Sequence, residues 1–229
     1  MTLNILHEDE LLIAIHKPHG LLVHRTRMAT DATEFAVQML RDQIGGHHVY
    51  PVHRLDRKTS GVLLFAKSKS ANQDVQQLFR ERHVSKKYTA IVRGFVSQSA
   101  TIDYPLLTND KLQESKTDYS LIQHYEIDLP FGKFKTSRYS HIWLKPTTGR
   151  YHQLRKHMAH IFHPIIGDRP HGCNKQNKLW KEQFQLTKML LHAETLELEY
   201  PKGNPLTIQS DHSAEFERVL QILKKSLIV

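Results

Sequence analysis

A single carboxylate among cations is the chemically most informative feature of the sequence. Asp56 stands between Arg54 on one side and Arg57 and Lys58 on the other. Adjacent positive charges favour the ionised form of a carboxylate, which suits a nucleophile or an electrostatic stabiliser and not a general acid. Ordinary loops whose charges form surface ion pairs show the same pattern, so charge spacing alone leaves both interpretations open.

The segment that follows Asp56 predicts how this carboxylate is held in place. Residues 61–66 form an apolar run of strand length, and the turn-forming residues Thr59 and Ser60 stand directly before it. Such a run, bounded by turn signals, is typical of a buried strand. We therefore expect Asp56 to lie on a loop that a core strand fixes, an arrangement that often carries chemistry.

Two later segments place further polar side chains on predicted elements. Residues 86–94 predict a strand that ends at a glycine, and Tyr88 taken alone is a core or interfacial ring whose hydroxyl finds a partner. Residues 147–157 are rich in cations, and from residue 151 onward the apolar spacing predicts a helix that carries Arg155.

A cluster of histidines offers an alternative of a different class, a metal-dependent hydrolase. The four residues His152, His157, His160 and His163 are close in sequence, and two of them, three residues apart on the predicted helix, could share a metal. No His-Glu-x-x-His pattern is present, and no nearby carboxylate completes a site. We therefore expect no metal.

Composition narrows the class of protein and of partner. The chain has 229 residues, a formal net charge of +9 and a hydrophobic content of 39%. Excess positive charge attracts polyanions, which makes nucleic acid the leading partner class. The sequence has no apolar run of membrane-spanning length, no secretory signal pattern, and a single cysteine, Cys173. One cysteine fits a reducing compartment, so we expect a cytoplasmic protein.

Helix signals recur along the chain. A helix over residues 33–44 would be capped by Thr30 or Asp31, and a helix over residues 70–83 would begin with its first residue, Ser70, as the cap. Ser213 is the expected cap of a final helix.

The arrangement of these elements predicts the fold class. Short strands separated by turns, with a few helices, favour an α+β fold with a largely antiparallel sheet. Residues 108–118 are polar and without periodicity, which predicts a flexible surface loop.

The literal strings in these segments resemble one enzyme family. His-Arg-Leu-Asp from residue 53, followed by Thr-Ser-Gly-Val-Leu-Leu-Phe-Ala-Lys from residue 59, resembles the catalytic motif of RluA-type pseudouridine synthases. Further strings with the family's pattern begin at residues 16 (His-Lys-Pro-His-Gly), 86 (Lys-Lys-Tyr-Thr-Ala), 148 (Thr-Gly-Arg-Tyr-His-Gln-Leu-Arg), 163 (His-Pro-Ile-Ile-Gly-Asp) and 190 (Leu-Leu-His-Ala). They appear in the family's order and cover nearly the whole chain.

The resemblance assigns roles residue by residue. It implies that Asp56 is the essential catalytic residue, that Tyr88 stacks on the target base and can remove the proton from C5, and that Arg155 pairs with Asp56. Arg54 would lie beside the flipped-out nucleotide, and Leu191 would pack against the reacting base, with Leu190 as an alternative.

Other RNA-contacting or loop-supporting candidates are Arg57, Lys58, Arg150 and His152. The string from residue 163 is expected to be a structural turn.

The resemblance also implies the fold, the reaction and the substrate. We expect the pseudouridine synthase fold, a mixed and mainly antiparallel central sheet with flanking helices and a central cleft. Residues 1–229 would form a single catalytic domain without a preceding S4-type RNA-binding domain. The reaction isomerises uridine to pseudouridine in RNA and needs no cofactor.

The opening strand and the string over residues 102–106 resemble the branch that modifies tRNA at uridine 65, in the T-stem region. A ribosomal RNA site is the alternative within the family. A non-catalytic RNA-binding or RNA-folding protein is the alternative outside it.

Overall fold

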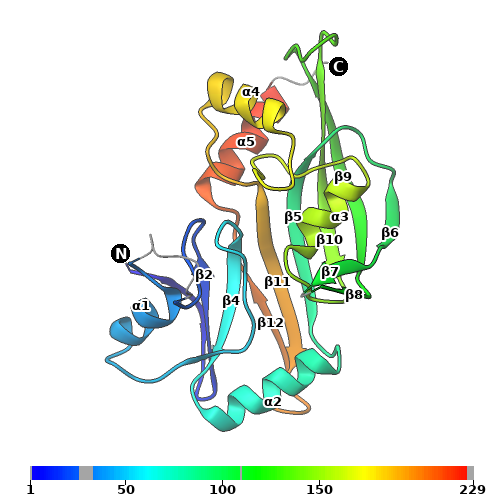
Figure 1. Cartoon of the computed structure of the whole chain (residues 1–229). Helices are drawn as coiled ribbons and strands as arrows, with labels where there is room; N and C mark the ends of the chain where they lie inside the picture. The colour runs from blue at the N-terminus through cyan, green and yellow to red at the C-terminus, as the bar shows by residue number, and fades with distance from the viewer. Residues whose placement is uncertain (1, 26–32, 109, 226–229) are drawn as a thin grey trace. The chain divides into compact units, whose positions relative to one another are not determined.

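The computed structural model describes residues 2–25, 33–108 and 110–225 (Figure 1). Helices and mainly antiparallel strands make up this part of the chain, which confirms the predicted α+β class. The residue contacts group into two compact units. The first unit comprises residues 1–86 and 193–211, and the second comprises residues 87–192 and 212–229.

The first unit is built on a sheet with strand order β1-β2-β4-β11, in which β12 also pairs with β11 and β3 with β4. All seven residues of β4 are buried, as the apolar run after Asp56 predicts. Helices α1 (Ala36–Gln43) and α2 (Lys69–Arg80) complete this unit. Its strands are β1 (Asn4–Glu8), β2 (Leu12–Lys17), β3 (Tyr50–Pro51), β4 (Ser60–Ala66), β12 (Pro205–Gln209) and β11 (Leu191–Glu199) from residue 193 onward.

One glycine at the start of β4 is required by close approach of another strand. Gly61 has a φ of +111°, and a Cβ atom there would lie 2.1 Å from the backbone oxygen of Ala193 in β11. The glycine in the Thr-Ser-Gly string is therefore a packing requirement.

The helix starts of the first unit differ from the predicted ones. The residue that caps α2 is Ser68 and not Ser70, because Ser68 has extended backbone angles and its hydroxyl accepts a hydrogen bond from the Ala71 amide at 3.1 Å. Helix α1 begins after Phe35, whose side chain makes no capping hydrogen bond. The predicted caps Thr30 and Asp31 lie outside the described residues.

The second unit contains a sheet with strand order β5-β10-β9-β6, and β10 pairs antiparallel with both neighbours. Its strands are β5 (Ser85–Arg93, here from residue 87), β6 (Ser99–Asp103), β9 (Lys116–Ile127) and β10 (Ser137–Pro146). Helices α3 (Gln153–His160), α4 (Asn174–Phe184) and α5 (Ala214–Lys225) belong to this unit.

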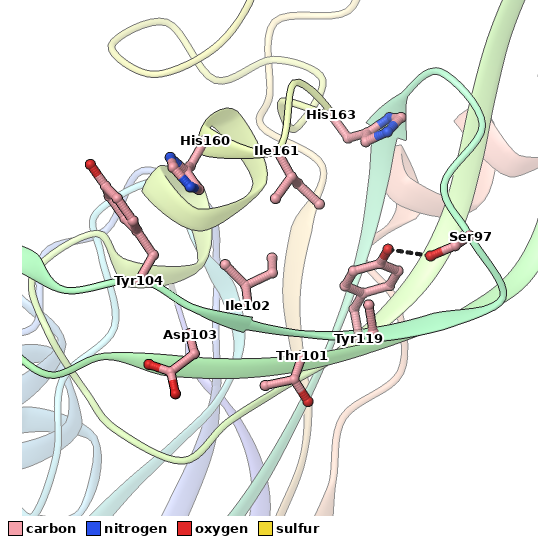
Figure 2. Close-up of a pocket in the computed structure, with 10 residues that line it drawn as sticks. Ser97, Thr101, Ile102, Asp103, Tyr104, Tyr119, His160, Ile161 and His163 are labelled. Atoms are coloured by element: carbon pink, nitrogen blue, oxygen red, sulfur yellow. Dashed lines mark hydrogen bonds between the residues drawn. The ribbon is translucent and has the colours of Figure 1, made fainter.

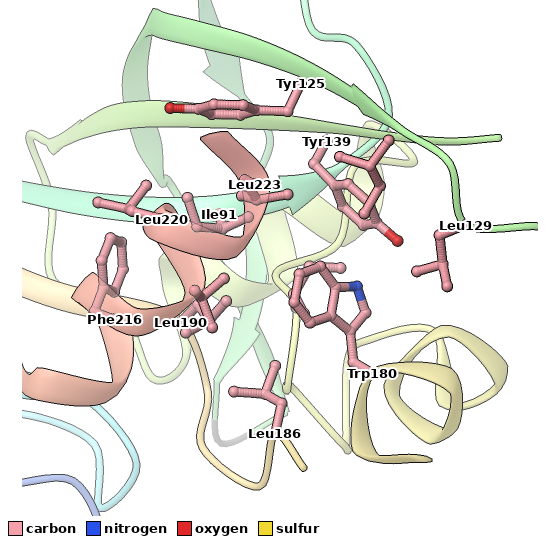
Figure 3. Packing of buried hydrophobic residues seen from close by; sticks show 13 residues of the cluster. Ile91, Tyr125, Leu129, Tyr139, Trp180, Leu186, Leu190, Phe216, Leu220 and Leu223 are labelled. Carbon is pink, nitrogen blue, oxygen red and sulfur yellow. The ribbon is translucent and has the colours of Figure 1, made fainter. Parts of the chain in front are cut away.

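Two separate hydrophobic clusters lie in the second unit. Ile142, Leu144 and Ala90 belong to the cluster that contains Leu154 and Met158 of α3. Helices α4 and α5 contribute to the other cluster, where Trp180 packs beside Tyr139 and Leu129 (Figure 3). The predicted final helix is confirmed, since the Phe216 amide donates to the Ser213 hydroxyl and the apolar face of α5 is buried.

The loop predicted over residues 108–118 is only partly a loop. Strand β7 (Leu106–Thr108) pairs with β8 (Lys111–Gln113), and β9 already begins at residue 116. Leu107 and Leu112 pair across the two strands, and both remain exposed. Cross-strand hydrogen bonds and not burial therefore order this segment, which is why it has no hydrophobic periodicity. Within the described ranges, no helix combines the length and the apolar character that crossing a bilayer requires.

Candidate active site

A buried ammonium group anchors the loop that carries Asp56. Lys17, the last residue of β2, is fully buried. Its Nζ donates hydrogen bonds to the backbone oxygens of Pro18 at 2.9 Å, Leu21 at 2.9 Å and Arg57 at 3.2 Å. Burial lowers the pKa of Lys17 from 10.5 to about 7, while the attraction of Asp56 opposes this shift. The residue next to Asp56 is therefore tied to the turn after β2.

The same turn makes two further hydrogen bonds to the loop. The Gly20 amide donates to the Arg57 oxygen at 2.8 Å, and Nε of Arg57 donates back to the Gly20 oxygen at 3.1 Å. Within the loop, the Thr59 amide donates to the backbone oxygen of Asp56 at 3.0 Å and closes a turn. Hydrogen bonds to the backbone oxygens of Asp56 and Arg57 thus fix the loop, while the side chain of Asp56 is half-buried.

The first residue of the motif, His53, has a structural role. Its Nε2 accepts a hydrogen bond from the Leu64 amide of β4 at 3.1 Å, and its ring stacks on Phe79 with 5.3 Å between centroids. Burial lowers the pKa of His53 from 6.5 to about 3, so the ring is neutral at pH 7 and can serve as an acceptor. Arg54, directly after it, is exposed, and its contact with RNA stays a prediction.

Tyr88 and Leu191 belong to one hydrophobic cluster of the second unit. Tyr88 is half-buried on β5, opposite Leu144 of β10, and packs against the cluster that contains Leu191 and Met158. Leu190 lies in the other cluster, with Phe216. Of the two candidate leucines, Leu191 is therefore the one placed with Tyr88.

Arg155 is held by Asp168, the last residue of the string that is expected to be a structural turn. Asp168 accepts two hydrogen bonds from the Arg155 guanidinium, with Nε to Oδ2 at 2.7 Å and Nη2 to Oδ1 at 2.8 Å. Both side chains are buried, at 4% and 1% exposed. This bidentate geometry fixes the plane of the guanidinium. The pairing of Arg155 with Asp56 stays a prediction.

The turn that carries Asp168 is itself fixed by helix α4. The Asn177 side chain accepts a hydrogen bond from the Gly167 amide at 2.8 Å and donates one to the backbone oxygen of Asp168 at 2.7 Å. Gly167 has a φ of +82°, and a Cβ atom there would lie 2.2 Å from the Lys188 oxygen. The final Gly-Asp of the string from residue 163 was the only sequence signal for this pair.

The residues just before α3 support the local loop. The Arg150 amide donates to Oε1 of Gln153 at 3.0 Å, and Nε of Arg150 donates to the Glu114 oxygen at 3.1 Å. His152 has a left-handed backbone, with a φ of 56°, so the helix begins at Gln153 and not at residue 151. RNA contact by Arg150 and His152 stays a prediction.

The histidine cluster does not assemble a metal site in the described part of the chain, where no group of three or more possible ligands is found. Both ring nitrogens of His157 already have partners, the hydroxyl of Thr117 and the backbone oxygen of Tyr104, each at 3.0 Å. The ring of His160 stacks on Tyr104 with 3.6 Å between centroids.

A pocket in the second unit lies beside β6 and α3 and has a volume of about 470 Å³ (Figure 2). Ile102, Tyr104 and His160 line it, and Tyr119 hydrogen-bonds to Ser97 at its edge. None of the predicted site residues lines this pocket, so it is not assigned to the reaction.

Comparison with known proteins decides the family. The family model described as RNA pseudouridylate synthase matches residues 11–160. The chain belongs to this family. The match includes the Asp56 loop, Tyr88 and Arg155, while Asp168 and Leu191 lie beyond its end.

Relatives and solved structures agree with this assignment. The chain is 44% identical to tRNA pseudouridine synthase C of Vibrio parahaemolyticus, over 89% of this chain and 87% of the relative. It is 43% identical to the protein of the same name from Salmonella typhi, over 95% of this chain and 88% of the relative. The structure of human RNA pseudouridylate synthase domain containing 4 superposes with a TM-score of 0.73 at 28% identity, covering 96% of this chain and 93% of that one.

The role of Lys17 predicts a loss of stability when its charge is removed. Lys17→Met keeps the length of the side chain but leaves buried carbonyl groups without their donor. We expect the free energy of unfolding to fall by about 1–3 kcal/mol in urea denaturation. Lys67→Met is the matched control, because Lys67 forms a partly exposed pair with Glu8 and should change stability by less than about 1 kcal/mol. An unchanged unfolding curve for Lys17→Met would contradict the anchoring role.

The lowered pKa of His53 predicts a specific pH dependence. Because the folded-state pKa lies below the unfolded value, neutral His53 stabilises the fold above pH 6.5, and this contribution is lost as the pH falls from 6.5 towards 3. We expect His53→Gln to flatten the fall of unfolding free energy over this window by up to about 1.4 kcal/mol per pH unit. His83→Gln, at an exposed site, should leave the slope as in the wild type. Equal slopes for wild type and His53→Gln would refute the assignment.

The Arg155–Asp168 pair predicts a larger effect in the second unit. Asp168→Asn preserves shape but leaves a buried guanidinium without its counter-charge, which typically costs about 3–5 kcal/mol. Equilibrium unfolding should show a loss of this size, whereas Glu182→Gln, which breaks an exposed pair with Lys178, should change stability by less than about 1 kcal/mol. If both variants unfold at the same denaturant concentration, the pair is not the determinant of stability inferred here.

Proposed function

We propose that this protein is a tRNA pseudouridine synthase that isomerises uridine 65, in the T-stem region, with Asp56 as the catalytic carboxylate. The observation that carries the proposal is the anchored loop of Asp56, which lies within the matched family region. The tRNA substrate is supported by the curated relatives named tRNA pseudouridine synthase C, which are 42–44% identical over about 90% of the chain.

The reaction rearranges atoms within one nucleotide. The bond between N1 of uracil and C1′ of ribose breaks, the base turns, and C5 bonds to C1′. The proton on C5 leaves, and N1 gains one, so the product has the composition of the substrate. No electron donor, electron acceptor or energy source is consumed, so the chemistry requires no cofactor.

Ionised Asp56 fits either of two first steps, attack on the nucleotide or removal of a sugar proton. In both cases it must keep its charge and its position. The three hydrogen bonds from Lys17 and the Gly20–Arg57 contacts supply the position. A loop fixed in this way loses little conformational entropy when the nucleotide binds.

The other residues divide into base contacts and RNA contacts. A base inside a stem must leave the stack before it can react, and exposed Arg54 is suited to fill the space it leaves. Tyr88, beside Leu191 in the same cluster, offers a ring on which the uracil can stack and a hydroxyl for removing the C5 proton. The guanidinium of Arg155, oriented by Asp168, is the proposed partner of Asp56. Arg57 and Lys58 are proposed phosphate contacts.

The charge of the chain fits this substrate. A net charge of +9 favours encounter with a polyanion such as tRNA. The single cysteine is compatible with the reducing cytoplasm, where we place the activity.

A ribosomal RNA target is the second candidate, because the motif residues act on the uridine itself and do not encode the surrounding stem. The names of the curated relatives favour tRNA over this candidate.

The proposal predicts that Asp56→Asn binds tRNA but forms no pseudouridine, because the amide keeps the shape of the side chain and loses its charge. Pseudouridine mapping on total RNA incubated with each variant measures this directly. Asp42→Asn, the same chemical change on the exposed side of α1, is the matched control and should modify RNA like the wild type.

The site of modification separates the candidates. A wild-type signal at tRNA position 65 supports the proposal in full. A signal only in ribosomal RNA would keep the reaction and overturn the substrate, and turnover by Asp56→Asn would overturn the role of Asp56.

A further inference from the structure

The turn between β9 and β10 and the segment after β5 carry aromatic rings that are each paired with a cation. The distances from the cationic group to the ring centroid are between 5.0 and 5.6 Å. The three pairs are Arg93 with Phe131, Lys133 with Phe134, and Arg138 with Phe95. We refer to these residues together with Lys135 as the hairpin surface. All of them belong to the second unit.

The turn presents one of these rings to solvent. Phe131 and Phe134 exchange two backbone hydrogen bonds, at 2.9 and 3.1 Å, so the turn is closed. Phe134 is nevertheless 59% exposed, while rings deeper in the same unit, such as Trp180 and Tyr139, are fully buried (Figure 3). A large ring on an ordered and exposed turn contributes little to the core, which favours a role in binding.

The charge of the hairpin surface is positive. Arg93, Lys133, Lys135 and Arg138 outnumber the neighbouring carboxylates Glu126 and Asp128. Glu126 already accepts hydrogen bonds from Thr136 at 2.6 Å and from Arg138 at 3.0 Å. The two lysines beside Phe134 are both exposed. Cations that alternate with exposed rings match a nucleic acid chain, in which phosphates alternate with bases.

The turn of the hairpin surface lies away from Tyr88. Strand β10 starts at Ser137, next to the turn, and Leu144 near its other end pairs with Tyr88 of β5. Seven steps of strand at about 3.3 Å per residue separate these two positions by roughly 23 Å. The turn that carries Phe134 is therefore distinct from the residue proposed to stack on the reacting base.

We propose that the hairpin surface is a second RNA-binding surface, on which an unpaired base stacks on Phe134 while Lys133, Lys135 and Arg138 contact the adjacent phosphates. This inference rests on the proposed function, in that the ligand is the RNA substrate. It adds that recognition extends to a single-stranded part of that RNA, outside the stem that contains the target. A protein partner would instead favour an apolar centre with fewer cations.

The test compares Phe134→Leu with Phe134→Tyr. Leucine keeps apolar area but removes the ring, whereas tyrosine keeps the ring, and both changes are at an exposed site that should not affect folding. On a complete tRNA transcript we expect Phe134→Leu to raise KM about fivefold to tenfold with kcat unaltered, and Phe134→Tyr to restore the wild-type KM. On the isolated stem-loop that contains the target, which lacks the other single-stranded regions of the tRNA, the difference between the variants should disappear.

Charge removal provides an independent readout. Lys133→Gln with Lys135→Gln should weaken binding of the full transcript and lower the slope of log affinity against log salt by about 1.4, the value for two phosphate contacts on a single strand. The matched control removes two charges from α4 through Lys175→Gln and Lys181→Gln. An equal effect of the control would indicate general charge attraction and overturn the proposal.

Failure of this proposal is distinguishable from failure of the proposed function. If the wild type forms no pseudouridine in any RNA, the proposed function fails, and filter binding of total tRNA still tests the hairpin surface. If the wild type is active and Phe134→Leu retains the wild-type KM and affinity, the hairpin surface is not an RNA contact. Loss of a copurifying protein partner without any change in RNA affinity would overturn the proposal in favour of protein docking.

Discussion

The buried ammonium of Lys17 is the interaction on which the Asp56 loop depends. A fully buried lysine is unfavourable unless its donors are satisfied, and here three backbone oxygens satisfy them. One of these oxygens belongs to Arg57, so the free-energy cost of burying the charge is coupled to the shape of the Asp56 loop. Burial lowers the pKa of Lys17 to about 7, while the attraction of Asp56 opposes this shift. The positive charge of Lys17 attracts Asp56, and burial of the ammonium reduces the screening of this attraction by salt.

The second unit uses the same physical device with different residues. The Arg155 guanidinium is buried against Asp168, and Asn177 fixes the turn that carries Asp168. In the first unit the buried Lys17 donates to backbone oxygens, and in the second unit the buried Arg155 donates to a carboxylate. In both cases the hydrogen bonds of the buried cation fix the position of a loop or a side chain. Burying a charge has a large desolvation cost, so this positioning and not a net gain in stability is the main consequence.

The sequence was sufficient for the parts of the fold and site that depend on local pattern. The buried strand after Asp56, the apolar face of α3 and the final helix follow from local pattern, and the family follows from strings of four to nine residues that appear in the family's order. Helix starts were less predictable, because both Ser68 and Ser70 have the side chain of a cap and only the backbone angles select between them. The β7–β8 pairing lies in a polar segment whose order comes from cross-strand hydrogen bonds and not from burial.

The missed site residues share a physical cause. Lys17 lies in the His-Lys-Pro-His-Gly string, and Asp168 ends the string that is expected to be a structural turn, so neither stands out by type or spacing. Their importance arises only when the chain folds and brings distant carbonyl groups or a guanidinium to them. Sequence patterns identify residues assigned to the substrate more easily than the residues that position them. The positioning contacts join segments 13 to 40 residues apart, which local patterns do not show.

Burial separates the cations of this protein into two functional groups. Lys17 and Arg155 are inside, have their donors satisfied by the protein, and add little to the field that an approaching RNA encounters. Arg54 and Lys133 are exposed to solvent, where a cationic side chain can meet a phosphate. The formal charge of +9 therefore overstates the charge available to RNA, since part of it is internal and burial lowers the pKa of Lys17 to about 7. The affinity for RNA must accordingly come from where the exposed cations gather, which is why an aromatic and basic hairpin can matter more than its few charges suggest.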